Sequence, residues 1–185
     1  MSLSVTPSKL LFALGGNLGT RDAIVTRFAH VVAAMRRWGD VRVSDIYDTA
    51  AIGPAQPNYL NAALLVNVRV ALPAPSQLLF WTQLVEASHG RTRTAEQWSA
   101  RTLDIDWLWC DSLNGDWPGP PPLTLPHPRL MDRAFVLRPC LDVMGPAWQP
   151  APNQPTIGTQ LQTPLIAAQR VTRTDLTIPT STERV

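Results

Sequence analysis

Lysine is nearly absent from this chain of 185 residues, because Lys9 is the only lysine among its 16 basic residues and all the others are arginines. Arginine presents a planar fork of donors that suits phosphate and carboxylate groups. A compositional bias towards alanine, arginine and proline accounts for most of these arginines. The 14 acidic residues leave a net charge of only +2, so we expect no nucleic-acid partner.

Cysteine and long hydrophobic runs are also scarce. Cys110 and Cys140 lack metal-ligand spacing and are too few for a disulfide framework, so we expect buried, inert thiols and no zinc. The apolar run from Leu10 to Leu14 is too short for a signal peptide or a membrane span. These absences predict a cytoplasmic protein that has no membrane partner.

The chain has enough hydrophobic residues, 45%, to build the core of one domain. From about Pro146 onward it becomes rich in proline, glutamine and threonine and poor in aromatic residues. We therefore expect one domain over residues 1–149 and a peripheral or flexible C-terminal segment over residues 150–185.

Hydrophobic periodicity predicts strands and helices in the order strand, helix, strand, strand, helix, strand. Inside the second helix we expect the apolar residues Leu78, Leu79, Leu84 and Val85. The order is that of the ferredoxin-like split pattern, so the predicted class is α+β with helices packed on one sheet. The six predicted elements cover residues 10–14, 20–38, 41–47, 61–70, 73–88 and 103–110.

Two aspartates stand out in the last of these strands, next to an arginine-rich loop that begins at Gly90. Asp104 and Asp106 are two residues apart, so alternation places both carboxylates on one face of the strand. The opposite face is then expected to carry Leu103, Ile105, Trp107 and Trp109. Unpaired charge is costly inside an apolar strand, so the pair requires a cationic partner, either a metal ion or arginine.

Five sequence blocks in consistent order resemble the 6-hydroxymethyl-7,8-dihydropterin pyrophosphokinase family. Together they extend from residue 10 to about residue 145, and their agreement in order makes the resemblance specific. The resemblance implies a ferredoxin-like fold and transfer of pyrophosphate from ATP to the pterin hydroxymethyl group in folate biosynthesis. The blocks are Ala13–Gly19, Tyr47–Thr49 with Gly53–Pro54, Gln56–Ala62, Gly90–Asp106 and Pro126–Leu137.

The resemblance also implies roles for the acidic pair and the loop. Asp104 and Asp106 match the carboxylates that hold two Mg²⁺ ions between the protein and the ATP phosphates, a use that suits hard oxygen ligands. Arg91 and Arg101 match arginines that stabilise charge on the transferred group. From spacing alone, a structural ion pair between the aspartates and arginine is an equally good interpretation.

The remaining matched residues divide between the two substrates. Those matching the pterin site include an aromatic pair that stacks on the ring and polar groups that bind its edge. They are Thr49, Tyr59, Asn61, Trp98 and Phe135. Those matching the nucleotide site, besides the two loop arginines, are Glu86, His127 and Arg133.

The chain departs from the family pattern at Ala50, Thr94, Ser99, Ala100 and Pro122, and lost cations there would weaken phosphate binding. Two alternative functions therefore stay open: a catalytically weak paralogue that binds pterin and nucleotide, and another two-metal nucleotide enzyme. The expected partners are ATP and the pterin, with other folate-pathway enzymes as further candidates, and the expected oligomeric state is a monomer.

Overall fold

The computed structural model describes residues 8–51, 53–92 and 99–180. Its centre is a six-stranded antiparallel sheet in the order β5-β1-β4-β3-β8. The long strand β4 pairs with β1 on one side and with both β2 and β3 on the other. Helices and an antiparallel sheet confirm the predicted mixed class.

The elements follow one another along the chain as strand, helix and connecting turn. The first half contains β1 Lys9–Gly16, α1 Arg21–Met35, β2 Gly39–Val43, β3 Tyr47–Thr49, β4 Tyr59–Val68 and α2 Pro75–Ser88. The second half contains β5 Asp104–Cys110, the hairpin β6 Gly115–Trp117 and β7 Leu123–Leu125, the 3-10 turn η1 Leu130–Asp132, α3 Ala134–Met144, α4 Ile157–Gln160, α5 Pro164–Ala167 and β8 Thr172–Arg173.

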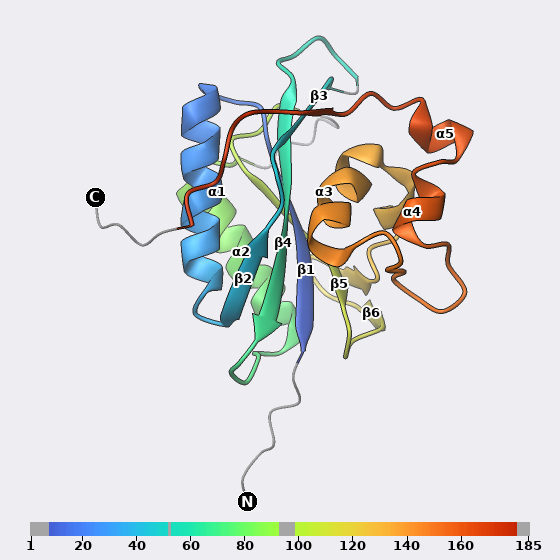
Figure 1. Cartoon of the computed structure of the whole chain (residues 1–185). Coiled ribbons are helices and arrows are strands. Elements are labelled where there is room, and N and C mark those ends of the chain that lie inside the picture. The colour runs from blue at the N-terminus through green and yellow to red at the C-terminus, as the bar shows by residue number, and fades with distance from the viewer. Residues whose placement is uncertain (1–7, 52, 93–98, 181–185) are drawn as a thin grey trace, which may run out of the picture.

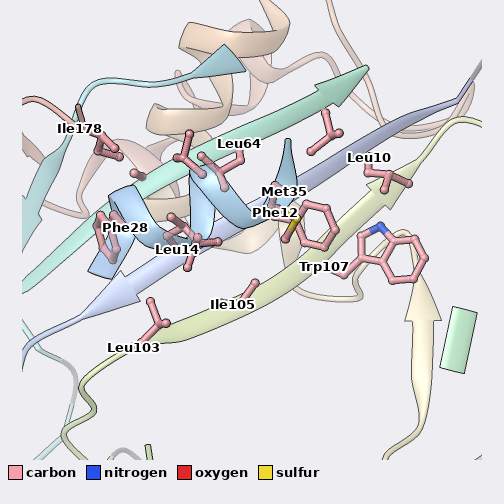
Figure 2. Packing of buried hydrophobic residues seen from close by; sticks show 14 of the residues in the cluster. Leu10, Phe12, Leu14, Phe28, Met35, Leu64, Leu103, Ile105, Trp107 and Ile178 are labelled. Atoms are coloured by element: carbon pink, nitrogen blue, oxygen red, sulfur yellow. The ribbon is translucent and has the colours of Figure 1, made fainter. Parts of the chain in front are cut away.

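Helices cover both faces of the sheet, with α1 and α2 on one face and α3, α4 and α5 on the other (Figure 1). Alternation along β1 explains this: Leu10, Phe12 and Leu14 pack towards α1, whereas Leu11 packs towards α3. Figure 2 shows the α1 side, where Phe12 lies beside Trp107 and near Met35. Two apolar cores therefore hold the sheet between two layers of helices.

Strand β5 presents Asp104 and Asp106 on the α3 face, while Leu103 and Ile105 join the α1 core. This confirms the predicted alternation. The predicted position of Trp109 on the same face as Trp107 is wrong. Successive β1 residues pair with Trp107 and then Trp109, so the extra residue forms a bulge, and Trp109 packs on the α3 side.

Two other predictions need correction. The expected single strand over residues 41–47 is two strands, β2 and β3, because the Ser44 side chain enters the ladder: its Oγ accepts the Ala63 N–H at 2.8 Å. In α2, Leu84 is 52% exposed, contrary to expectation. Leu78, Thr82 and Glu86 are the buried residues of that helix, and the inward-facing carboxylate turns Leu84 towards solvent.

Beyond residue 150 the chain crosses from one side of the sheet to the other (Figure 1). Ile157, Leu161 and Ile166 pack against the α3 core. The chain then pairs β8 with β3 and places Ile178 in the α1 core (Figure 2). None of the helices in the described ranges has the length and apolar character needed to cross a lipid bilayer.

Candidate active site

Asp104 and Asp106 lie where two pockets meet. We call the first, of about 210 Å³, the Thr49 pocket, and the second, of about 330 Å³, the Glu86 pocket. Within the described ranges, the two aspartates are the only residues that line both. The Thr49 pocket includes Thr49, Tyr59, Asn61, Arg101, Arg133 and Phe135, and the Glu86 pocket includes Glu86, Arg91, Ile105, Trp107, Pro122 and His127.

The floor of the Thr49 pocket is a cross-strand row made by Asp104, Gly15 and Asn61. A Cβ atom at Gly15 would lie 3.7 Å from Asn61 Oδ1 and 3.7 Å from Asp104 Cβ, so the glycine keeps the space between them open. Asn61 is buried and donates through Nδ2 to Thr49 Oγ1 at 2.8 Å. That hydrogen bond fixes the orientation of the amide on the pocket floor.

Aromatic side chains from two elements line the same pocket. Tyr59 comes from β4, and its hydroxyl donates to the Ser99 carbonyl at 3.3 Å. Phe135 comes from the first turn of α3, and the Arg133 guanidinium lies 5.5 Å from the centre of its ring. The pocket thus combines flat apolar surfaces with a polar floor, which suits a planar ligand that carries hydrogen-bonding edges.

Arginines from both ends of the loop contact Asp104. Arg91 forms ion pairs with Asp104 and with the buried Glu86, while Arg101 Nη1 lies 2.6 Å from Asp104 Oδ2. Glu86 also accepts the Ile105 N–H at 2.8 Å. These contacts join α2, the start of the loop and β5 into one charged cluster.

Asp106 has a different environment. Burial and the neighbouring Asp104 carboxylate raise the pKa of Asp106 to about 7, although Arg133 and Arg91 act in the opposite direction. Within the described ranges, Asp106 forms no ion pair. Two adjacent carboxylates, one enclosed and without a direct counter-ion in that part of the chain, are a donor set that suits a hard divalent cation.

His127 is held beside β5 by two backbone contacts. Its own N–H donates to the Leu108 carbonyl at 2.7 Å, and its Nδ1 accepts the Arg129 N–H at 3.1 Å. Burial, followed by the charges of Arg133 and Arg129, lowers its pKa. A neutral imidazole therefore lines the Glu86 pocket at neutral pH.

Comparison with known proteins identifies the family. A family model described as 7,8-dihydro-6-hydroxymethylpterin-pyrophosphokinase (HPPK) matches residues 11–145. The chain belongs to this family.

Similar proteins include curated relatives and solved structures. A 2-amino-4-hydroxy-6-hydroxymethyldihydropteridine pyrophosphokinase from Bacillus subtilis is 36% identical over 135 residues, which cover 71% of this chain and 75% of the relative. The protein of the same name from Synechocystis sp. is 33% identical over 138 residues, which cover 73% of this chain and 65% of the relative.

A solved structure of a Plasmodium falciparum HPPK-DHPS triple mutant with pteroate aligns with a TM-score of 0.63 at 12% sequence identity. The alignment covers 86% of this chain and 43% of that chain. At this identity the likeness establishes the fold alone.

The HPPK residues expected from sequence are brought together around the two pockets, with one group split between them. Thr49, Tyr59, Asn61 and Phe135, expected for pterin, all line the Thr49 pocket. Of those expected for the nucleotide, Glu86, Arg91 and His127 line the Glu86 pocket, whereas Arg101 and Arg133 line the other. Trp98 and Thr94 lie outside the described residues.

Sequence reasoning about the HPPK blocks missed Asn17. Its side chain is 2% exposed, and its Nδ2 donates to Gln56 Oε1 at 2.9 Å and to the Pro57 carbonyl at 3.0 Å. Its Oδ1 accepts the Arg101 N–H at 2.8 Å. Asn17 stands in the glycine-rich turn after β1, where a buried amide between glycines was the available signal.

Proposed function

We propose that this chain transfers pyrophosphate from ATP to 6-hydroxymethyl-7,8-dihydropterin and forms AMP and the pterin diphosphate for folate synthesis. The observation that carries the proposal is the position of Asp104 and Asp106 at the junction of two pockets with different linings. A transfer reaction requires its two substrates to meet at one point, and the carboxylates mark that point. The names of the relatives support the same reaction.

The Thr49 pocket is assigned to the pterin. Tyr59 and Phe135 offer faces for the flat ring, while Asn61 and Thr49 bind its donor and acceptor edge. Trp98, which lies outside the described residues, keeps its expected role of covering the ring. The pocket opens onto Asp104 and Asp106, so the hydroxymethyl group would point towards the carboxylates.

The Glu86 pocket is assigned to ATP. Arg91 and His127 line it directly, and Arg101 and Arg133 reach the junction from the other pocket. Glu86 holds Arg91 in place by an ion pair rather than meeting the phosphates itself. Positive groups around the junction then stabilise the charge that develops on the phosphate oxygens.

Asp104 and Asp106 are the residues that would hold two Mg²⁺ ions. When bound, Mg²⁺ neutralises phosphate charge and aligns the attacking and leaving oxygens. The raised pKa of Asp106 and its lack of an ion pair within the described ranges support a cation at this position. Arg91 and Arg101 would exchange Asp104 for phosphate oxygens as the substrates bind, which leaves the carboxylate available to the metal.

Several properties of the whole molecule extend the proposal. The strand order β5-β1-β4-β3 and the two helices on one face support a ferredoxin-like arrangement. We assign the catalytic domain to residues 1–149 and treat residues 150–185 as a peripheral segment. A cytoplasmic monomer and association with other folate-pathway enzymes complete the proposal, and the name HPPK-DHPS suggests two linked activities in the Plasmodium protein.

A catalytically weak paralogue is the second candidate, because Ser99 and Ala100 replace a Gly-Pro pair expected from the family pattern. Incubation with ATP, Mg²⁺ and the hydroxymethyl dihydropterin should release AMP, and EDTA should abolish the release. Release of ADP would contradict the proposed reaction. Binding of the pterin and a non-hydrolysable ATP analogue without AMP formation would favour the paralogue instead.

A further inference from the structure

Arg133 lies between two backbone groups that are hydrogen-bonded by one distant side chain. The Gln169 side chain follows α5, where its Oε1 accepts the Ala134 N–H at 2.8 Å and its Nε2 donates to the Asp132 carbonyl at 3.0 Å. These two bonds flank Arg133 in the chain. Gln169 is therefore placed to fix the backbone from which the Arg133 side chain projects.

The same glutamine replaces a missing helix cap. Arg133 is the N-cap residue of α3, and its own side chain makes no capping hydrogen bond within the described structure. The first N–H groups of a helix have no partner in the helix and are usually capped by a nearby side chain. Gln169, 35 residues away from Ala134, accepts one of them. The direction of the first turn of α3, which carries Phe135, thus depends on the C-terminal segment.

Further contacts hold Gln169 in place. Gln160 Nε2 donates to the Met131 carbonyl at 2.7 Å, so a second glutamine of this segment binds the η1 turn just before Arg133. Ile157, Leu161 and Ile166 bury their side chains in the α3 core. Because these apolar anchors fix α4 and α5, the two amides reach the η1–α3 junction from a rigid support.

We propose that Gln169 is a positioning residue that aligns Arg133 and Phe135 for substrate binding; this inference rests on the proposed function. The family match ends at residue 145, so this support comes from a part of the chain beyond the matched region. Phe135 and Arg133 both line the Thr49 pocket, and the guanidinium lies over the aromatic ring. Loss of the two hydrogen bonds would let both side chains shift together.

The test compares Gln169→Ala with Gln162→Ala, an exposed glutamine of the same segment, in the full-length chain. Gln169→Ala should raise the KM for the pterin about fivefold, the scale of one lost hydrogen bond, with kcat within about twofold of wild type. Gln162→Ala should leave both constants unchanged. Gln169→Glu retains an acceptor for the Ala134 N–H and should bring KM back to within about twofold of wild type.

Hydrogen exchange at the Ala134 amide, followed by NMR, gives a readout that needs no turnover. Exchange should accelerate in Gln169→Ala but not in Gln162→Ala. A lower melting temperature with an unchanged KM would make Gln169 merely structural and overturn the proposal, as would unchanged exchange. A folded wild-type protein that releases no AMP would overturn the proposed function instead, while the exchange measurement would still decide whether Gln169 holds Ala134.

Discussion

Asn17 and Arg101 are joined by a reciprocal pair of hydrogen bonds. The backbone N–H of Asn17 donates to the Arg101 carbonyl at 2.9 Å, and the Arg101 N–H donates to Asn17 Oδ1 at 2.8 Å. The other end of the Asn17 amide binds Gln56 and Pro57. One buried side chain therefore connects a catalytic candidate to the loop that precedes β4.

Asn17→Ala should lower both activity and stability. It removes three hydrogen bonds and leaves the buried Arg101 N–H without its partner, so we expect the free energy of unfolding to fall by about 2 to 4 kcal/mol. The turnover number should fall as well, because Arg101 loses its fixed position. Urea unfolding and AMP release measure the two effects. Asn58→Ala, at an exposed residue that donates to Asp48, is the control and should change neither by much.

Neutral substitutions at the two aspartates should separate activity from stability. We expect Asp104→Asn and Asp106→Asn each to reduce turnover at least about 100-fold, because both remove a charge from the proposed metal site. Pterin binding, measured by calorimetry, should be partly retained in both. Equal loss of turnover and pterin binding would indicate that the pair has a structural role.

The stability changes of these two variants should have opposite signs in metal-free buffer. Asp104→Asn breaks ion pairs with Arg91 and Arg101, so it should lower the free energy of unfolding by about 1 to 3 kcal/mol. Asp106→Asn removes an enclosed charge whose pKa is already raised, so it should increase that free energy by about 1 to 3 kcal/mol. Urea unfolding in the presence of EDTA compares them, and destabilisation of both would show that Asp106 is well stabilised as an anion.

Phe135→Ala should weaken pterin binding more than ATP binding. The ring contributes an apolar face to the Thr49 pocket, so its loss should raise the KM for the pterin about tenfold or more. Phe80 provides a matched control, since it is 58% exposed on α2 and lines neither pocket. Steady-state kinetics with each substrate varied in turn would distinguish this result from an equal loss for both substrates, which would contradict the assignment.

His127 should make the protein less stable as the pH falls from 7 to 5. Its folded-state pKa lies below the ordinary value of 6.5, so the unfolded chain binds a proton more readily. The stability contribution is thus present above pH 6.5 and is lost as the pH falls through the folded pKa. His127→Gln should reduce the slope by at most about 1.4 kcal/mol per pH unit. Identical slopes for the two proteins in urea titrations without ligands would contradict the proposed environment of His127.

The sequence predicted the helices and most strands because these depend on local periodicity. Thr20 was expected as a helix cap, for example, and its Oγ1 does accept the Ala23 N–H at 3.2 Å. The side chain of Trp109 was misplaced because its direction depends on how β5 pairs with β1, which no local pattern records. Leu84 was misplaced for a related reason, since the inward position of Glu86 depends on Arg91 and β5.

The candidate site followed the same division. Asp104 and Asp106 could be placed on one face by alternation, and the family resemblance named the residues around them. Their place at the junction of two pockets requires α2, α3 and the sheet to be assembled first. Gln169 could not have been recognised, because a glutamine in a segment rich in polar residues has no local feature that indicates a distant backbone partner.

The short pairing of β8 with β3 also has a consequence for solubility. Thr172 and Arg173 occupy backbone groups at one edge of the sheet, and Arg173 adds an ion pair with Asp45 there. Open strand edges pair readily with other chains and promote aggregation. A chain shortened to residue 149 would expose this edge together with the apolar surface that Ile157 and Ile166 cover, so self-association should accompany the loss of the C-terminal segment.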